Sequence, residues 1–257
     1  MTGVLDLFRL DGKVAVVTGG GRGLGRGIAT ALAEAGADIV IVGQTASPDA
    51  VAVIEATGRR AWDVPTDLLA ATPADLTALV ATIVGLAGRV DVLVNNAGII
   101  RRQPALELTA ENWEDVIDLN LSTVFYLTQA VARVLVEQGD GGKIINIASM
   151  LSFQGGKIVP SYTASKSAVA GLTKALASEW AGLGINVNAI APGYFATDNT
   201  AQLRADEGRS AEILGRIPAG RWGSPQDLQG AAVFLASPAA AYVHGSVLAV
   251  DGGWLTR

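Results

Sequence analysis

The chain has 257 residues, of which 50% are hydrophobic and 17% charged, and its formal net charge is −5 with a sequence pI near 4.9. This acidic balance argues against a nucleic-acid-binding surface. The absence of cysteine excludes disulfides and thiolate chemistry, and a single histidine, His244, leaves no basis for a multi-histidine metal site or a histidine triad, so we expect no metal. The N-terminus lacks a signal-peptide pattern, and polar residues interrupt the longest apolar stretch, 119–136. We therefore expect a soluble cytoplasmic protein that does not contact a membrane.

Strand and helix patterns alternate along the chain. We expect strands near residues 14–18, 39–43, 60–64, 91–95, 143–148, 185–191 and 246–250, and helices near 23–35, 48–57, 73–87, 110–138, 162–182 and 225–236. Such alternation predicts βαβ units, and hence one Rossmann-like α/β domain over residues 1–257. In this domain a doubly wound parallel sheet of about seven strands carries helices on both faces. The polar segment 194–216 is predicted to be a mobile lid over the substrate.

A glycine-rich segment, Thr18–Gly25, joins the first expected strand to an amphipathic helix. Glycines permit a tight turn there and let backbone amides approach a pyrophosphate at the positive end of the helix. The spacing Gly-x-x-x-Gly-x-Gly differs from the standard dinucleotide fingerprint. Its position between a buried strand and a helix nevertheless favours a dinucleotide site over an ordinary turn.

Tyr162 and Lys166 are four residues apart, with Ser149 a short loop upstream. On a helix, side chains at i and i+4 lie on the same face. A free phenol has a pKa of about 10, and a nearby cation favours the phenolate. We therefore predict that Tyr162 is a general acid/base whose pKa is lowered by Lys166, and that Ser149 donates a hydrogen bond to a substrate oxygen. The alternative is an ordinary surface pair, because this spacing alone is common by chance.

The candidate residues share a location in the predicted sheet. Gly19, Asn95, Ser149 and Pro192 follow the first, fourth, fifth and sixth expected strands. In open parallel sheets, ligands bind beyond the carboxyl ends of the strands, at the switch point in strand order. The four segments are therefore predicted to meet at one site.

The glycine pattern, Asn95–Gly98, Ser149, Tyr162-x-x-x-Lys166 and Pro192–Gly193 occur in the order used by the short-chain dehydrogenase/reductase family. The chain resembles this family from about residue 10 to its C-terminus. The resemblance implies a nicotinamide cofactor, hydride transfer at a carbonyl or alcohol carbon, and a homotetramer. It implies the catalytic residues Asn120, Ser149, Tyr162 and Lys166, with Asn120 bending its helix and holding a water that relays protons to the lysine. It implies cofactor binding by Gly19, Arg22, Gly23, Leu24, Gly25, Asp67, Leu68, Asn95, Ala97, Gly98, Tyr162, Lys166, Pro192, Gly193 and Thr197.

The choice between NAD and NADP stays open from the residues. NAD specificity usually comes from an acid about 20 residues beyond the glycine loop. The second strand ends in Gln44 and Thr45, while Asp38 stands at its opposite end. Arg22 could pair with a 2′-phosphate or be a solvated loop cation. Asp67 could accept from the adenine amino group or only form a turn.

Arg101 and Arg102 follow the fourth-strand motif, where they could bind a substrate carboxylate or form an exposed basic pair. Segments 95–102, 143–156 and 202–206 resemble one subfamily, the NAD(H)-dependent dehydrogenases that interconvert 2-keto-3-deoxygluconate and 2,5-diketo-3-deoxygluconate in uronate polymer breakdown. We accordingly expect a small anionic sugar-acid substrate, with NAD(H) favoured by the resemblance and NADP(H) not excluded. The expected substrate-binding residues are Arg101, Arg102, Ser149, Gln154 and Tyr162. The alternatives are a generic ketone or 3-oxoacyl reductase and, more remotely, a non-enzymatic NAD(P) sensor.

Overall fold

The computed structural model describes residues 3–257. Its centre is a seven-stranded sheet in the order β3-β2-β1-β4-β5-β6-β7, in which every neighbouring pair is parallel. The strands are β1 (Val14–Thr18), β2 (Asp38–Gly43), β3 (Ala61–Pro65), β4 (Val92–Asn95), β5 (Gly142–Ile147), β6 (Ile185–Pro192) and β7 (Val247–Val250). The order of the strands reverses between β1 and β4, so the predicted doubly wound fold and its seven strands are confirmed.

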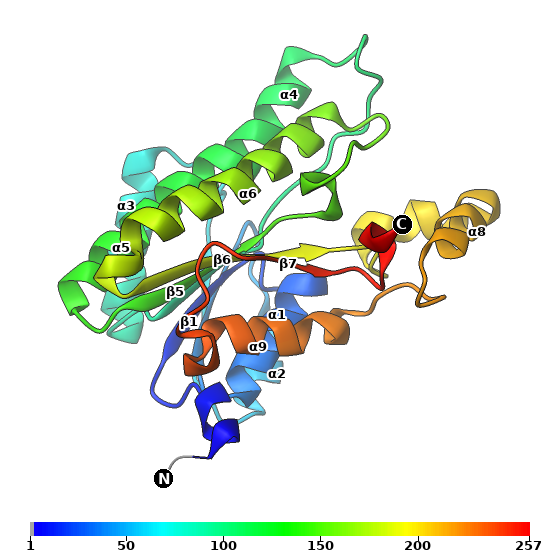
Figure 1. Ribbon diagram of the computed structural model, residues 1–257. Helices are drawn as coiled ribbons and strands as arrows, with labels where there is room; N and C mark the ends of the chain where they lie inside the picture. Colours follow the sequence, from blue (N-terminus) through cyan, green and yellow to red (C-terminus); the bar gives the residue numbers. More distant parts are fainter. Residues whose placement is uncertain (1–2) are drawn as a thin grey trace.

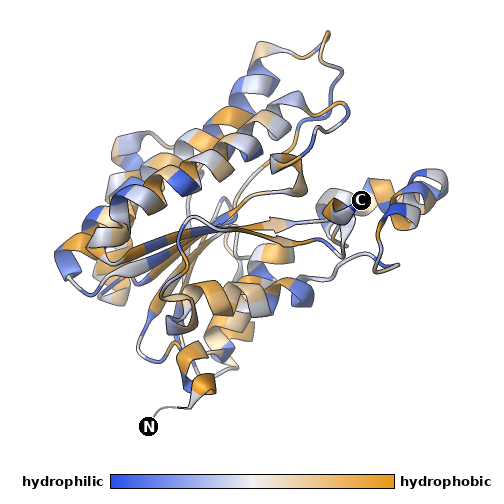
Figure 2. Ribbon diagram, viewed as in Figure 1, coloured by the Kyte–Doolittle hydropathy of each residue, from blue (hydrophilic) through white to orange (hydrophobic). Residues whose placement is uncertain are grey.

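Helices cover both faces of this sheet (Figure 1). One face carries α1 (Gly23–Glu34), α2 (Pro48–Glu55) and α9 (Gln229–Ala236), and the other carries α3 (Pro73–Ala87), α4 (Ala110–Ile117), α5 (Thr123–Gln138) and α6 (Pro160–Trp180). Each face has its own hydrophobic core, represented by Ile28 and Leu235 on the first and by Leu127 and Ile144 on the second. The helices accordingly show hydrophobic stripes beside hydrophilic ones (Figure 2). The strands are buried on both faces and therefore read as continuous apolar runs.

The predicted helix 110–138 is one continuous helical segment interrupted by a π turn. Residues Asp118–Ser122 form this turn, in which the Thr123 amide donates to the Asp118 carbonyl oxygen. By length and composition alone, the segment Ala110–Gln138 is long and apolar enough to cross a membrane, yet more than half of its most apolar stretch is buried inside the fold. A buried core helix can have the same length and composition, and this segment packs against α3 and the sheet.

The segment 194–216, predicted only as a polar lid, contains two helices. These are α7 (Ala201–Ala205) and α8 (Glu207–Arg216), which project beyond the strand ends beside the C-terminus (Figure 1). Helix α8 begins where the Asp206 side chain accepts from the Arg209 amide, a normal N-cap. Its buried Ile213 packs with Met150 and Trp254, so these helices have a small core of their own.

Candidate active site

One large cavity opens at the carboxyl ends of the strands. It has a volume of about 1790 Å³ and extends from the glycine loop after β1 to helix α8 and the C-terminal residues. Such a volume exceeds that of an ordinary small-ligand pocket of roughly 300–1,000 Å³. The cavity can therefore hold a dinucleotide and a substrate together, at the switch point between β1 and β4.

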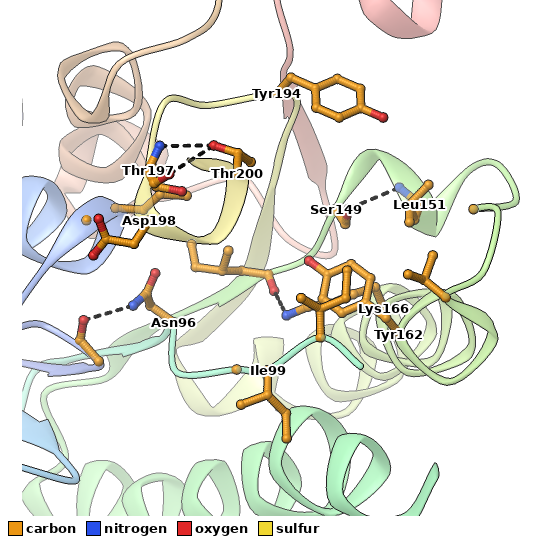
Figure 3. A pocket seen from close by; sticks show the side chains of 18 of the residues that line it. Asn96, Ile99, Ser149, Leu151, Tyr162, Lys166, Tyr194, Thr197, Asp198 and Thr200 are labelled. Atoms are coloured by element: carbon orange, nitrogen blue, oxygen red, sulfur yellow. Dashed lines mark hydrogen bonds between the residues drawn. The ribbon is translucent and has the colours of Figure 1, made fainter. Parts of the chain in front are cut away.

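Ser149, Tyr162 and Lys166 all line this cavity. Ser149 follows β5, whereas Tyr162 and Lys166 lie in the first turns of α6 and present their side chains on the same side of it (Figure 3). Lys166 Nζ lies 5.7 Å from the Tyr162 ring centroid and donates to the Ile147 carbonyl oxygen at 2.6 Å. The Ser149 hydroxyl accepts from the Leu151 amide at 3.1 Å. The structure thus brings the three predicted residues to one wall.

The electrostatics of Tyr162 differ from the prediction. Burial raises the pKa of Tyr162 above its ordinary value, while a hydrogen bond with Ser149 and the charge of Arg102 act in the opposite direction. Burial also lowers the pKa of Lys166 to about 8. The expected lowering of the Tyr162 pKa by Lys166 is therefore not found. Desolvation of the phenolate outweighs the Ser149 hydrogen bond and the charge of Arg102, and the Lys166 ammonium donates to the Ile147 carbonyl oxygen instead.

Asn120 lies in the π turn and is fully buried. Its Oδ1 accepts from the Ile99 amide and its Nδ2 donates to the Ile99 carbonyl oxygen, each at 2.9 Å, and Nδ2 also reaches Ser165 Oγ at 3.3 Å. These bonds explain why a polar residue interrupts an apolar helix. Asn120 does not line the cavity itself; it ties the loop after β4 to α6, which carries Tyr162.

The glycine loop fits a dinucleotide because side chains are excluded from it. A Cβ added to Gly25 would overlap the Gly19 carbonyl oxygen, and one added to Gly19 would lie 3.2 Å from the Ala97 Cα. Gly19 and Gly23 also have φ angles of 63° and 54°, in the region that favours glycine. The loop leads into the N-terminus of α1, whose first amides suit phosphate oxygens. The residues present therefore fit a pyrophosphate.

The adenosine end of such a cofactor would meet residues that follow β2 and β3. Gln44 donates to Asp67 Oδ2 at 3.1 Å, and Asp67 Oδ1 accepts from the Leu69 amide at 3.1 Å. Asp67 thus forms the turn that one interpretation predicted while also lining the cavity. Asp38 is paired with Arg60 and does not line it. Arg22 lies 3.6 Å from Asp198, which follows β6 in the chain.

Most predicted cofactor residues line the cavity, and two do not. Asn95 is buried and donates from Nδ2 to Thr128 Oγ1 and to Asn146 Oδ1, both at 2.8 Å, so it joins β4 to α5 and β5. Pro192 ends β6 and also lies outside the cavity lining. The predicted residues that line it are Gly19, Arg22, Gly23, Leu24, Gly25, Asp67, Leu68, Ala97, Gly98, Tyr162, Lys166, Gly193 and Thr197.

Several residues that line the cavity are not among the site residues predicted from the sequence. Asn96 lines the cavity and holds the glycine loop, since its Nδ2 donates to the Thr18 carbonyl oxygen at 2.9 Å. Tyr194 lines the opposite wall, above Ser149 in Figure 3. Arg216 and Trp254 line the far end. Asn96 stands inside the predicted motif Asn95–Gly98, and Tyr194 and Arg216 stand at the two ends of the predicted lid segment 194–216, so these three could have been found. Trp254 has no local signal.

The two arginines after the β4 motif both line the cavity, together with Gln154. Arg101 Nη2 is bound to Asp115 Oδ2 at 2.8 Å. Arg102 is close enough to Tyr162 and Tyr194 for its charge to lower the pKa of both phenols. The two arginines therefore differ: Arg101 is anchored to α4 through Asp115, and the charge of Arg102 acts on the Tyr162 phenol.

A parallel sheet with this glycine cradle and this Ser-Tyr-Lys wall defines a nicotinamide-dependent dehydrogenase. The family profile described as enoyl-(acyl carrier protein) reductase matches residues 19–255. This chain belongs to the short-chain dehydrogenase/reductase family.

Three known proteins illustrate the similarity. The chain is 59% identical over 257 residues to 2-dehydro-3-deoxy-D-gluconate 5-dehydrogenase of Dickeya dadantii (strain 3937), covering 99% of this chain and all of that protein. It is 57% identical over 256 residues to the Escherichia coli (strain K12) protein of the same name, with 99% and 100% coverage. The structure also matches gluconate 5-dehydrogenase from Burkholderia cenocepacia J2315, solved with NADP and tartrate, with a TM-score of 0.93 and 41% identity over 99% of this chain and 100% of that one.

Proposed function

We propose that the protein transfers a hydride between a nicotinamide cofactor and the C5 alcohol or ketone of a keto-deoxy sugar acid. The pair would be 2-keto-3-deoxygluconate and 2,5-diketo-3-deoxygluconate, in the breakdown of uronate polymers. The observation that carries the proposal is the position of Ser149, Tyr162 and Lys166 in the same cavity as the glycine cradle. Support for the substrate comes from the names of the relatives at 57–59% identity.

Tyr162 is the proposed general acid/base. Its phenol protonates the substrate oxygen in ketone reduction and accepts that proton in alcohol oxidation. The bound cofactor donates or accepts the hydride. Ser149, hydrogen-bonded to Tyr162, holds the same substrate oxygen in line with the phenol. Tyr162 is half-buried and its phenol is desolvated, so its proton is exchanged at a wall where a positive charge nearby has a large effect.

Lys166 and Asn120 are proposed to support this step. Lys166 holds a buried positive charge beside the phenol and can bind the ribose hydroxyls of the cofactor. Asn120 fixes the main chain at Ile99 and contacts Ser165 on α6, so it keeps the loop after β4 and the catalytic helix in register. A water relaying protons to Lys166 stays a prediction drawn from the family.

For the cofactor we propose a preference for NAD(H). Beyond β2 the cavity is lined by Gln44, Thr45 and Ser47, which carry no charge. Arg22 is the cation of the described glycine loop, and Asp198 lies 3.6 Å from it and offsets its charge. A 2′-phosphate therefore meets a weakly positive site here. NADP(H) fits the same fold, since the Burkholderia cenocepacia structure holds NADP.

The test is a panel of sugar acids, neutral ketones and 3-oxoacyl thioesters, followed by nicotinamide absorbance with each cofactor. We expect the highest kcat/KM with keto-deoxy hexonates. Turnover of ketones or acyl thioesters alone would instead make the protein a generic ketone or 3-oxoacyl reductase. Cofactor binding with no turnover of any substrate would favour the sensor function.

The remaining expectations concern assembly and location. We propose a homotetramer in the cytoplasm. Support comes from large side chains that are partly exposed on the α4–α5 face: Trp113 is 41% exposed and Tyr126 39%. Strand β7, at the edge of the sheet, offers a second surface for a symmetric contact. Light scattering at assay concentration tests the assembly, and a fully active monomer would contradict it.

A further inference from the structure

We propose that Arg216, on lid helix α8, binds the carboxylate of the substrate. The inference rests on the proposed function, since it assigns one end of a sugar acid to a residue that neither the motifs nor the predicted basic pair include. In such a substrate the reacting carbon, C5, and the C1 carboxylate stand at opposite parts of the chain. The carboxylate must therefore be held at a distance from Tyr162, on another wall of the cavity.

The arginines next to the reaction centre do not meet this requirement. Arg101 is engaged by Asp115 at 2.8 Å, which offsets its charge. Arg102 lines the cavity close enough to Tyr162 for its charge to act on the phenol. A carboxylate drawn to Arg102 would place its own negative charge against the phenol and oppose the formation of the phenolate. The carboxylate site is therefore expected elsewhere.

Arg216 is an exposed residue of the cavity lining, and two contacts from different parts of the chain hold its side chain. Its guanidinium carbon lies 4.0 Å from the centroid of the Trp254 ring, in a cation–π stack. Its Nη2 donates to Gln154 Oε1, in the loop between Ser149 and Tyr162, at 3.2 Å. Trp254 is 5% exposed and belongs to the small core under α8, so the platform is rigid. The guanidinium is thus oriented before a ligand arrives.

The surroundings of Arg216 have the chemistry of a carboxylate site. Tyr194 packs edge-on against Trp254 with ring centroids 4.8 Å apart. Burial raises the pKa of its phenol, and the charges of Arg209, Arg216 and Arg102 lower it, while Glu212, which is paired with Arg209, acts in the opposite direction. Arg216, Gln154, Tyr194 and Trp254 all line the same cavity as Tyr162. A stacked guanidinium keeps N–H groups available for a bidentate pair with a carboxylate, and a Tyr hydroxyl adds a further donor.

The position of Arg216 also couples recognition to the lid. It is the last residue of α8, while Gln154 belongs to the loop that joins the two catalytic segments. A carboxylate bound to Arg216 would therefore connect α8 to that loop. An anionic substrate would stabilise the lid over the site, and a neutral analogue would not.

The experiment compares Arg216→Ala, Arg216→Lys and wild type in complex with cofactor. Calorimetry measures the binding of gluconate and of sorbitol, which have the same hydroxylated skeleton with and without a carboxylate. We expect Arg216→Ala to weaken gluconate binding by about tenfold to a hundredfold and to leave sorbitol unchanged. The gluconate affinity of Arg216→Lys should fall between those of wild type and Arg216→Ala, because lysine keeps the charge and lacks the planar guanidinium fork. Arg9→Ala, which removes the same charge from an exposed pair outside the cavity, is the control.

Equal gluconate affinity in wild type and Arg216→Ala, or an equal loss for gluconate and sorbitol, would overturn the inference. Failure of wild type to bind gluconate would also overturn it. The proposed function is judged separately from turnover of the substrate panel. If Arg216→Ala selectively weakens gluconate binding but the protein turns over no sugar acid, the proposed function is refuted and the carboxylate site at Arg216 stands. If the protein turns over sugar acids and Arg216→Ala leaves their KM unchanged, the proposed function stands and the site is refuted.

Discussion

Lys166 Nζ donates to the Ile147 carbonyl oxygen at 2.6 Å while lying 5.7 Å from the ring centroid of Tyr162. This contact links the last residue of β5 to the catalytic helix and holds a buried amine at the wall that bears the phenol. Because burial lowers the pKa of Lys166 to about 8, the amine is charged below that pH and loses its charge above it. The lysine is therefore a structural link between β5 and α6 that also places an amine with a pKa of about 8 at this wall.

Replacing Lys166 with alanine should lower turnover and weaken cofactor binding together. The variant loses the bond to Ile147, the charge beside the phenol and a donor for the ribose hydroxyls. Stopped-flow turnover and fluorescence titration with NADH measure the two effects. A slower enzyme with unchanged cofactor affinity would contradict the second role.

Tyr162→Phe should reduce turnover by about 10²- to 10⁴-fold, because a general acid/base typically contributes that much. Cofactor affinity should stay within a few-fold, since the ring still packs. Tyr242→Phe, which removes a fully exposed phenol outside the cavity, is the matched control and should keep its activity. Near-normal turnover in Tyr162→Phe would exclude the mechanism.

Arg102→Ala should move the pH profile of alcohol oxidation to higher pH. In the proposed mechanism, oxidation needs the phenolate of Tyr162, so the rate rises with pH through the pKa of this residue. The Arg102 charge lowers that pKa, and its removal raises the pKa, so the same rate is reached at a higher pH. Ser149→Ala should act in the same direction, since the Ser149 hydrogen bond also lowers the pKa. A profile shifted to lower pH in either variant would contradict this account.

Gly25→Ala should abolish cofactor binding while the protein remains folded. The added Cβ would overlap the Gly19 carbonyl oxygen and displace the loop from the path of the pyrophosphate. Gly85→Ala on α3 is the control, because nothing lies within 4 Å of a Cβ there and alanine favours the helix by about 1 kcal/mol. Equal NADH affinity in both variants, measured by fluorescence, would show that the cradle tolerates a side chain.

The sequence alone sufficed for the fold because its signals are local. Each buried strand is a short apolar run, and each helix carries an amphipathic or capped pattern, so the expected strands lie within a residue or two of the observed ones. The departures come from tertiary contacts. The π turn in 110–138 forms where Asn120 bonds to Ile99, 21 residues earlier in the chain. No periodicity along the helix contains that information.

The meeting of Ser149, Tyr162 and Lys166 at one wall was also readable from the sequence, since Tyr162 and Lys166 share a helix face and Ser149 is close in the chain. What only the tertiary structure decided is the charge balance around them. Burial outweighs the nearby cations at Tyr162 because desolvation depends on every element packed around the phenol. Likewise Arg101 and Arg102 are adjacent in sequence, yet Arg101 pairs with Asp115 while the charge of Arg102 acts on the Tyr162 phenol. Arg216, stacked on Trp254, bonds to Gln154, which lies 62 residues earlier in the chain. Only the folding of the chain brings these two residues together.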